Sequence, residues 1–263
     1  MSKQLAGKSA VVTGSTSGIG RAIATLLASE GANVMLNGFG EAGEIESLRS
    51  GLEKSHGGKV RYHAADMSKP PQIAEMVRTA EREFGAVDIL VNNAGIQHVS
   101  PVEDFPDDRW EAVISINLSS AFYATKAALP GMKKRRWGRV INIASAHGLV
   151  ASPNKSAYVA AKHGIVGFTK ATALEVAETG VRANAICPGF VLTPLVQKQI
   201  DDLARQHNIT TERATRDYIL APQPTKEFVT VDQIAAMALY LCSEAAAQIN
   251  GSSISIDGGW TAR

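Results

Sequence analysis

Tyr158 and Lys162 lie four residues apart in a stretch whose pattern predicts a helix over 156–178, so their side chains share one face. A free tyrosine has a pKa of ~10 and is a poor base at neutral pH. An ammonium group one turn away favours the phenolate, which would let Tyr158 take a proton from an alcohol and return it in the reverse direction. The same pair also occurs by accident on helix surfaces, without any function.

Ser145 and Asn117 are the next candidates for chemistry. Ser145 follows a predicted strand over 139–143 and so lies at the strand end where α/β sheets place their ligands. Its hydroxyl could hold a substrate oxygen while Tyr158 exchanges the proton. Asn117 lies in the middle of a predicted helix, where an amide side chain is an indifferent helix former. It could be a packing polar group, or it could hold a water molecule that links Lys162 to solvent.

The elements that must position these groups alternate along the chain between strand-length apolar runs and longer helical patterns. Parallel strands need such crossover connections, so the pattern predicts an α/β fold with one doubly wound domain, a mainly parallel sheet and helices on both faces. Ligands then bind beyond the carboxyl ends of the strands. The predicted strands are 9–13, 33–37, 60–64, 87–91, 139–143, 182–186 and 253–256, and the predicted helices are 20–30, 72–84, 107–132, 156–178 and 231–243.

The first predicted strand leads into a loop rich in glycine and serine, and a predicted helix follows. Small residues let the backbone approach a pyrophosphate, and free amides at the helix start bind its charge. The spacing Gly-x3-Gly-x-Gly differs from the usual dinucleotide fingerprint, so a plain strand–helix turn is the alternative. The strand before and the helix after favour cofactor binding, and the candidate residues are Gly14, Ser15, Thr16, Ser17, Gly18, Ile19 and Gly20.

The second predicted strand bears on the choice between NAD and NADP. Its tip carries no acid for the adenine-ribose hydroxyls and no Lys or Arg at 37–40 for a 2′-phosphate, which Glu41 would oppose. Phe39 could cover the adenine or simply pack, and Arg21 is the nearest cation. These residues favour NAD. Further candidate cofactor residues at later strand tips are Asp66 (alternatively a turn cap), Met67, Asn93, Ala94 and Gly95.

Several of these segments together resemble the classical short-chain dehydrogenase/reductase family in order and spacing, over essentially the whole chain. They are TGSTSGIG at 13–20, NNAG at 92–95, Asn117, Ser145, Tyr158-x3-Lys162 and Pro188-Gly189. The resemblance implies a seven-stranded Rossmann-type sheet, usually in a homotetramer. It also implies a catalytic tetrad of Asn117, Ser145, Tyr158 and Lys162, with Tyr158 and Lys162 contacting the cofactor as well. The residues it implies beside the nicotinamide are Pro188, Gly189, Val191 and Thr193.

Polar residues near the tetrad predict a site for a carboxylate. His147 follows Ser145 by two positions, Lys155 precedes Tyr158 by three, and Gln97 follows NNAG. Gln199 lies early in the segment 191–229, which interrupts the strand–helix alternation inside the single domain 1–263. This segment is interpreted as a substrate lid, with a surface excursion as the alternative. A cation and several neutral donors around one opening would hold a carboxylate, although each residue alone could be an ordinary surface or loop residue.

The same four residues, with the runs 37–40, 95–99, 145–148 and 258–260, resemble the bacterial D-3-hydroxybutyrate dehydrogenases. The resemblance implies NAD as cofactor, Gln97, His147, Lys155 and Gln199 around the substrate carboxylate, and Trp260 at the methyl end. Phe190 stands where some relatives have tryptophan. The implied reaction is the oxidation of (R)-3-hydroxybutyrate to acetoacetate without a metal, with Tyr158 as general acid and base. The alternatives are a 3-oxoacyl reductase or polyol dehydrogenase of the same family, and a dinucleotide-binding regulator without catalysis.

Composition limits the partners. The 263 residues, with 45% hydrophobic and 20% charged side chains, can bury the core of a globular protein. The net charge of +2 gives no broad attraction to nucleic acid or to a membrane, and the basic run 133–136 falls where a predicted helix ends. The two cysteines, Cys187 and Cys242, have no partner at metal-ligand spacing. No leader or transmembrane run is visible, so we expect a cytoplasmic protein whose partner is a small hydroxy or keto acid.

Overall fold

Seven parallel strands form one sheet in the order β3-β2-β1-β4-β5-β6-β7. The computed structural model describes residues 3–192 and 194–262. Every residue of β1, β4 and β5 is buried, as expected for strands that are covered on both faces. This confirms the predicted seven-stranded, doubly wound domain. The strands are β1 (Ser9–Val12), β2 (Asn33–Asn37), β3 (Val60–His63), β4 (Ile89–Asn92), β5 (Gly138–Ile143), β6 (Val181–Pro188) and β7 (Ser253–Ile256).

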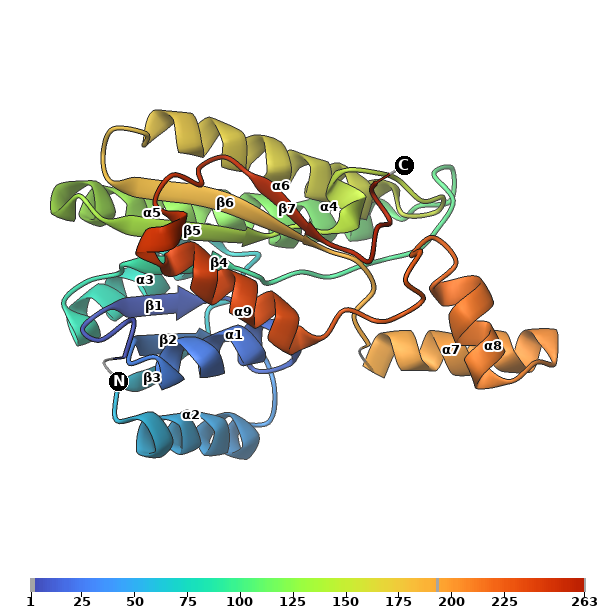
Figure 1. Cartoon of the computed structure of the whole chain (residues 1–263), viewed down its shortest axis with the longest axis horizontal. Helices are drawn as coiled ribbons and strands as arrows, with labels where there is room; N and C mark the ends of the chain where they lie inside the picture. The colour runs from blue at the N-terminus through green and yellow to red at the C-terminus, as the bar shows by residue number, and fades with distance from the viewer. Residues whose placement is uncertain (1–2, 193, 263) are drawn as a thin grey trace.

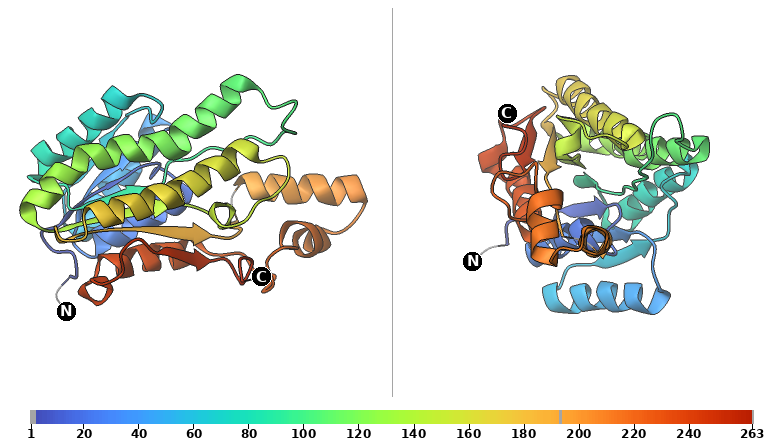
Figure 2. Two further views of the ribbon diagram at one scale, coloured as in Figure 1. Left: turned by 90° about the horizontal axis from the view of Figure 1, so that it is seen from above. Right: turned by 90° about the vertical axis from the view of Figure 1, so that its right-hand side faces the viewer.

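Helices cover both faces of the sheet (Figures 1 and 2). One face carries α1 (Gly18–Ser29), α2 (Ala42–His56) and α9 (Val231–Cys242), and the other carries α3 (Pro70–Phe84), α5 (Ser120–Arg135) and α6 (Ser156–Glu175). The two buried apolar clusters on either side of the sheet hold these helices in place. As a result, the amino-terminal ends of α1 and α6 lie at the carboxyl edge of the strands, where a ligand would bind.

Two helical segments differ from the prediction. The sequence pattern did not indicate α2, which buries only Ile45 and Leu52 along its length and therefore has a weak apolar period. The single helix predicted over 107–132 is interrupted. It consists of α4 (Asp107–Ile114), a wider π turn at Ser115–Ser119 and then α5. Such a turn inserts one extra residue into the helix and is frequent at functional sites.

The segment 191–229 projects from the main body beyond the carboxyl ends of the strands (Figures 1 and 2). It contains α7 (Pro194–His207) and α8 (Thr211–Ala214), whose apolar side chains form a small cluster of their own. The segment leaves the sheet after β6 and returns through a parallel bridge between Val191 and Val229. It is thus a helical excursion tied to the sheet at both ends.

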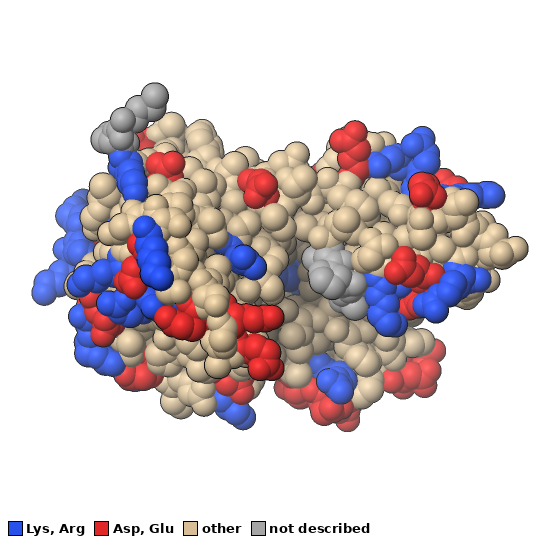
Figure 3. Space-filling model, turned by 90° about the horizontal axis from the view of Figure 1, so that it is seen from below, with Lys and Arg blue, Asp and Glu red and all other residues tan. Residues whose placement is uncertain are grey.

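The surface carries charges of both signs. Figure 3 shows Lys and Arg interspersed with Asp and Glu over one face, and a hollow between the main body and the projecting α7 and α8. Among residues 3–192 and 194–262, the structure contains no helix with the length and apolar character needed to cross a membrane.

Candidate active site

The site lies where β1 and β4 adjoin, because the strand order runs outward in opposite directions from this pair. Hydrogen bonds tie the loops after the two strands together. The Thr13 hydroxyl accepts from the backbone amides of Asn93 at 2.9 Å and Ala94 at 3.0 Å. The Asn93 side-chain amide donates to the carbonyls of Thr13 at 2.9 Å and Gly14 at 3.0 Å. The glycine-rich loop and the NNAG segment therefore form one cradle.

The start of α1 fits a dinucleotide pyrophosphate. Its N-cap residue Ser17 makes no side-chain cap bond, and its first turn holds no acid, so the amides there are free of local acceptors. A Cβ at Gly20 would lie 2.3 Å from the Gly14 carbonyl oxygen, whereas one at Gly18 would meet nothing within 4 Å. Gly20 is thus required for the packing of the loop, and Gly18 faces open space where a phosphate could approach.

The adenosine end is formed around the tip of β2. Asn37 is fully buried, accepts from the Gly14 amide at 3.3 Å and donates to the carbonyls of His63 and Ala65. The Phe39 side chain is 71% exposed. It shares a surface hollow with Arg21 and Glu44. The acid nearest this hollow is therefore Glu44 of α2, whereas the sequence analysis had considered Glu41.

Asp66 is engaged in a turn. Its carboxylate accepts from the Ser68 backbone amide at 2.8 Å, and this bond is the main reason that its pKa is lowered. This bond agrees with the turn-cap alternative for Asp66.

Ser145, Tyr158 and Lys162 line one cavity of about 370 Å³. Ser145 comes two residues after the end of β5, while Tyr158 and Lys162 lie on successive turns of α6. The Ser145 hydroxyl accepts from the His147 backbone amide at 3.1 Å and is close enough to the Tyr158 hydroxyl to oppose the rise in the pKa of that phenol. The Lys162 ammonium donates to the Ile143 carbonyl at 2.7 Å and lies 5.5 Å from the centroid of the Tyr158 ring. The structure thus brings the three predicted catalytic side chains together.

The pKa of Tyr158 moves in the opposite direction from the sequence-based expectation. Burial raises this pKa, and the hydrogen bond with Ser145 only opposes the effect. Burial also lowers the pKa of Lys162 to about 8. Desolvation of the phenol outweighs the acidification expected from Lys162, whose ammonium donates to the Ile143 carbonyl.

Asn117 lies in the π turn between α4 and α5, and its side-chain amide pairs with the backbone of Ile96. Its oxygen accepts from the Ile96 amide at 2.8 Å, and its nitrogen donates to the Ile96 carbonyl at 2.9 Å. The residue is 3% exposed and does not belong to the lining of the cavity. Both ends of the amide thus hold the loop that carries Gln97, which agrees with the packing alternative for this side chain.

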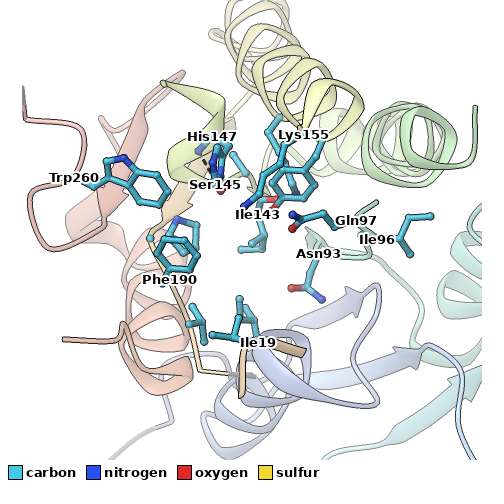
Figure 4. A pocket seen from close by; sticks show the side chains of 18 of the residues that line it. Ile19, Asn93, Ile96, Gln97, Ile143, Ser145, His147, Lys155, Phe190 and Trp260 are labelled. Atoms are coloured by element: carbon cyan, nitrogen blue, oxygen red, sulfur yellow. Dashed lines mark hydrogen bonds between the residues drawn. The ribbon is translucent and has the colours of Figure 1, made fainter. Parts of the chain in front are cut away.

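Gln97, His147, Lys155 and Gln199 all line the same cavity as the Ser145 hydroxyl. Figure 4 shows Gln97 and Lys155 on one side of the opening and His147 beside Ser145. Burial lowers the pKa of Lys155. Burial, followed by the charge of Lys155, lowers the pKa of His147 to about 4, so its imidazole is neutral near pH 7.

Aromatic rings form the opposite wall. Trp260 stacks on Phe190 with ring centroids 5.1 Å apart and an interplanar angle of 5°. It meets the His147 ring edge-on at 5.0 Å. Figure 4 shows Trp260 and Phe190 across the cavity from Lys155 and Gln97. The Lys155 ammonium nevertheless lies 5.8 Å from the centroid of the Phe190 ring, so cationic and aromatic groups border the same cavity as the Ser145 and Tyr158 hydroxyls.

The cavity lining also includes several predicted cofactor residues: Ile19, Asn93, Gly95, Pro188, Gly189 and Val191. The predicted residue Thr193 lies outside the described residues. The sequence analysis missed the lining residues Ile96, Ile143, Ala144 and Val196. These side chains are apolar, and in the sequence nothing distinguishes them from ordinary core or surface positions.

The chain belongs to the short-chain dehydrogenase family, since the sequence profile of that family matches residues 8–204. It is 59% identical to a D-beta-hydroxybutyrate dehydrogenase of Cupriavidus necator over 98% of this chain and 100% of that protein. It is 58% identical to a D-beta-hydroxybutyrate dehydrogenase of Rhizobium meliloti over 97% of this chain and 99% of that one. These matches confirm both resemblances that the motifs indicated.

A solved structure shows the same fold. A variant of actinorhodin polyketide ketoreductase, crystallised with NADPH, superposes with a TM-score of 0.90 at 35% identity and covers 100% of both chains. The two proteins therefore share one fold over their whole length.

Proposed function

We propose that this protein catalyses (R)-3-hydroxybutyrate + NAD⁺ ⇌ acetoacetate + NADH + H⁺. The observation that carries the proposal is one cavity lined by the Ser145, Tyr158 and Lys162 side chains, by the Lys155 ammonium and by the stacked rings of Phe190 and Trp260. A four-carbon hydroxy acid has matching parts, with a carboxylate, a secondary hydroxyl and a methyl group in that order. The identity of 58–59% to two enzymes named for this substrate supports the same assignment.

NAD is the proposed cofactor, and when bound it would supply the hydride acceptor. The free amides at the start of α1 would hold its pyrophosphate, with Thr16 and Ser17 beside them. Pro188, Gly189 and Val191 would face the nicotinamide. At the adenosine end Arg21 and Glu44 border the same hollow as the uncharged Phe39, and the Glu44 carboxylate opposes an additional phosphate there.

Tyr158 is the proposed general acid and base. In the oxidation direction Tyr158 first loses its own proton to solvent, the phenolate oxygen then takes the proton of the substrate hydroxyl, and Ser145 holds the same substrate oxygen by a hydrogen bond. Lys162 is the cation nearest the phenol ring, and it would stabilise the phenolate as the proton leaves. In the reverse direction Tyr158 protonates the oxygen of the keto group. Asn117 contributes by positioning the loop of Ile96 and Gln97.

Lys155 would bind the substrate carboxylate, together with the amides of Gln97 and Gln199 and the neutral imidazole of His147. Charge-assisted hydrogen bonds of this kind are stronger than neutral ones and would orient the hydroxyl carbon. The segment 191–229 would close over the substrate as a lid, because α7 supplies Gln199 and Val196 to the cavity lining.

The substitution Lys155→Ala tests this binding mode. We expect kcat/KM for 3-hydroxybutyrate to fall about 30-fold or more, because the loss of one partner of a desolvated charge pair is costly. NAD affinity should be unchanged, and Lys54→Ala, at an exposed lysine of α2, serves as the matched control. Wild-type kcat/KM in Lys155→Ala would remove Lys155 from the carboxylate site.

The decisive experiment is NADH fluorescence with both enantiomers of 3-hydroxybutyrate and a panel of short hydroxy acids, polyols and 3-oxoacyl thioesters, with NAD and NADP. We expect turnover of the (R) enantiomer with NAD. Relatives at 35% identity include the 3-oxoacyl-[acyl-carrier-protein] reductase of Thermotoga maritima. Preference for thioesters would assign that activity instead, and NAD binding without turnover of any alcohol would indicate a regulator.

We further propose a cytoplasmic homotetramer. Support for the location is that both cysteines, Cys187 and Cys242, are free thiols buried in the core. Support for assembly is an apolar surface groove between α5 and α6 that includes the partly exposed Phe122. Sedimentation equilibrium at micromolar concentration should give four times the mass of the chain.

A further inference from the structure

The turn over residues 257–261, which follows β7, carries Trp260 into the cavity on an intrinsically flexible backbone. Gly258 and Gly259 both have positive φ, +56° and +84°. Two consecutive glycines lose more conformational freedom on ordering than any other pair of residues. A turn of this composition needs specific contacts if it is to hold a large side chain in one place.

Asp257 supplies these contacts. Its carboxylate accepts from the Gly259 amide at 3.0 Å, the Thr261 amide at 2.9 Å and the Thr261 hydroxyl at 2.6 Å. Its backbone carbonyl accepts from the Trp260 amide at 3.1 Å. The residue is 6% exposed, so these bonds form with little competition from water. One buried carboxylate thus hydrogen-bonds the residues on both sides of Trp260, Gly259 and Thr261.

The turn also packs directly on the segment by which the 191–229 excursion returns to the sheet. The Thr225 amide donates to the Gly258 carbonyl at 3.2 Å, and a Cβ at Gly258 would lie 2.2 Å from the Thr225 hydroxyl. The buried Gln223 side chain accepts from the Phe190 amide at 3.1 Å. Backbone hydrogen bonds therefore hold both partners of the stack: the turn of Trp260 is bonded to Thr225, and Phe190 is bonded to Gln223.

We propose that Asp257 is a positioning residue that limits the length of the substrate's apolar end by keeping Trp260 stacked on Phe190. The inference rests on the proposed function. In the proposed binding mode the carboxylate lies at Lys155 and carbon 4 lies against Trp260, whose ring is across the cavity from Lys155 (Figure 4). A loosened turn lets the Trp260 ring leave the stack, and the cavity then accepts a longer chain.

The test compares (R)-3-hydroxybutyrate with (R)-3-hydroxypentanoate in the wild type and in Asp257→Asn. In the variant the side-chain NH2 group replaces one carboxylate oxygen. It faces an N–H or O–H donor of Gly259 or Thr261, so part of the hydrogen bonding around Trp260 is lost. One extra methylene in an apolar pocket is discriminated by about tenfold or more. We expect the ratio of kcat/KM for 3-hydroxybutyrate to kcat/KM for 3-hydroxypentanoate to fall about tenfold in Asp257→Asn. The change should come mainly through KM, and NAD affinity should be unchanged.

Asp88→Asn is the matched control. Asp88 is also 6% exposed, and its carboxylate accepts from the Ser9 amide at 3.1 Å and Arg135 at 3.2 Å, at the opposite end of the sheet. A merely structural role for Asp257 would make the two variants alike, with a lower Tm and the wild-type ratio. An unchanged ratio in folded Asp257→Asn overturns the proposal.

Thr261→Val provides a milder second variant in case Asp257→Asn does not fold. It removes the hydroxyl that donates to Asp257 at 2.6 Å, and the ratio should fall about threefold. A wild-type ratio in this variant would then overturn the proposal. Failure of the proposed function is distinguishable, because in that case the wild-type protein itself would turn over neither hydroxy acid.

Discussion

At the scale of single residues, Tyr158 has to exchange a proton in a place where burial raises its pKa. A phenol with a raised pKa forms little phenolate at neutral pH, so the site depends on the groups that stabilise the phenolate. Ser145 does so by hydrogen bonding, and Lys162, with a pKa of about 8, is largely cationic at neutral pH. The burial that raises the pKa of Tyr158 also strengthens the attraction of its phenolate to this charge.

Removal of the phenolic oxygen tests this role. We expect Tyr158→Phe to lower kcat by about 10²- to 10⁴-fold, the range for the loss of a general acid or base. NAD affinity measured by calorimetry and the Tm should stay near the wild-type values. Tyr240→Phe, at a tyrosine of α9 that is 44% exposed, is the matched control and should be fully active. Normal turnover in Tyr158→Phe would assign the proton transfer to another group.

His147 gives the protein an acid-sensitive site. Burial and the nearby Lys155 charge lower its pKa from 6.5 to about 4, so between these pH values the unfolded chain binds a proton that the folded protein does not. The stability that this group contributes is therefore present above about pH 6.5 and lost as the pH falls towards 4. A shift of this size corresponds to about 3 kcal/mol.

We expect His147→Gln, which cannot titrate, to flatten the fall in unfolding free energy between about pH 6.5 and 4. Urea denaturation at a series of pH values measures this slope. His207→Gln, at an exposed imidazole of α7, should keep the wild-type slope. Equal acid sensitivity in the His147→Gln variant and the wild type would show that other groups cause it.

At the scale of elements, the loop between β1 and α1 depends on glycine for a reason that differs from position to position. Gly20 lies on α1, where a Cβ would meet the Gly14 carbonyl and the Asn93 amide at 2.3 and 2.5 Å. Gly51 on α2 has open space around it and an ordinary helical backbone. The same substitution should therefore have opposite effects at these two positions.

We expect Gly20→Ala to lower the unfolding free energy by about 1–3 kcal/mol through overpacking and to weaken NAD binding. Gly51→Ala should raise the unfolding free energy by about 0.5–1 kcal/mol, because alanine loses less backbone entropy in a helix. Chemical denaturation and NAD calorimetry measure both effects. Tight NAD binding in Gly20→Ala would contradict the close packing of this loop.

At the scale of the whole molecule, α7 and α8 stand apart from the main body. Their apolar cluster is small and is separate from the clusters that cover the sheet. Regions with few buried contacts open locally at a lower free energy than the core. We expect amide hydrogen exchange over 196–220 to be faster than in α9, and NAD with acetoacetate to slow it. Exchange that is unaffected by ligand would contradict a lid function.

Much of the fold follows from the sequence because its signals are local. Strand-length apolar runs and the helical periods between them set the alternation that a parallel sheet requires. Tyr158 and Lys162 share a face because they are four residues apart on one helix. The glycine-rich loop is recognisable because its neighbouring strand and helix are contiguous with it. The weakly amphipathic α2 and the π turn at 115–119 escaped detection since neither leaves a clear period.

The remaining features were decided by tertiary structure. Asn117 pairs with Ile96, and Asn93 pairs with Thr13 across 80 positions of sequence. Asp257 holds the turn of Trp260, and Trp260 finds its partner in Phe190. No short-range pattern encodes such pairs, because they depend on how distant segments pack. The direction of the Tyr158 pKa shift depends likewise on how completely the fold excludes water from that hydroxyl.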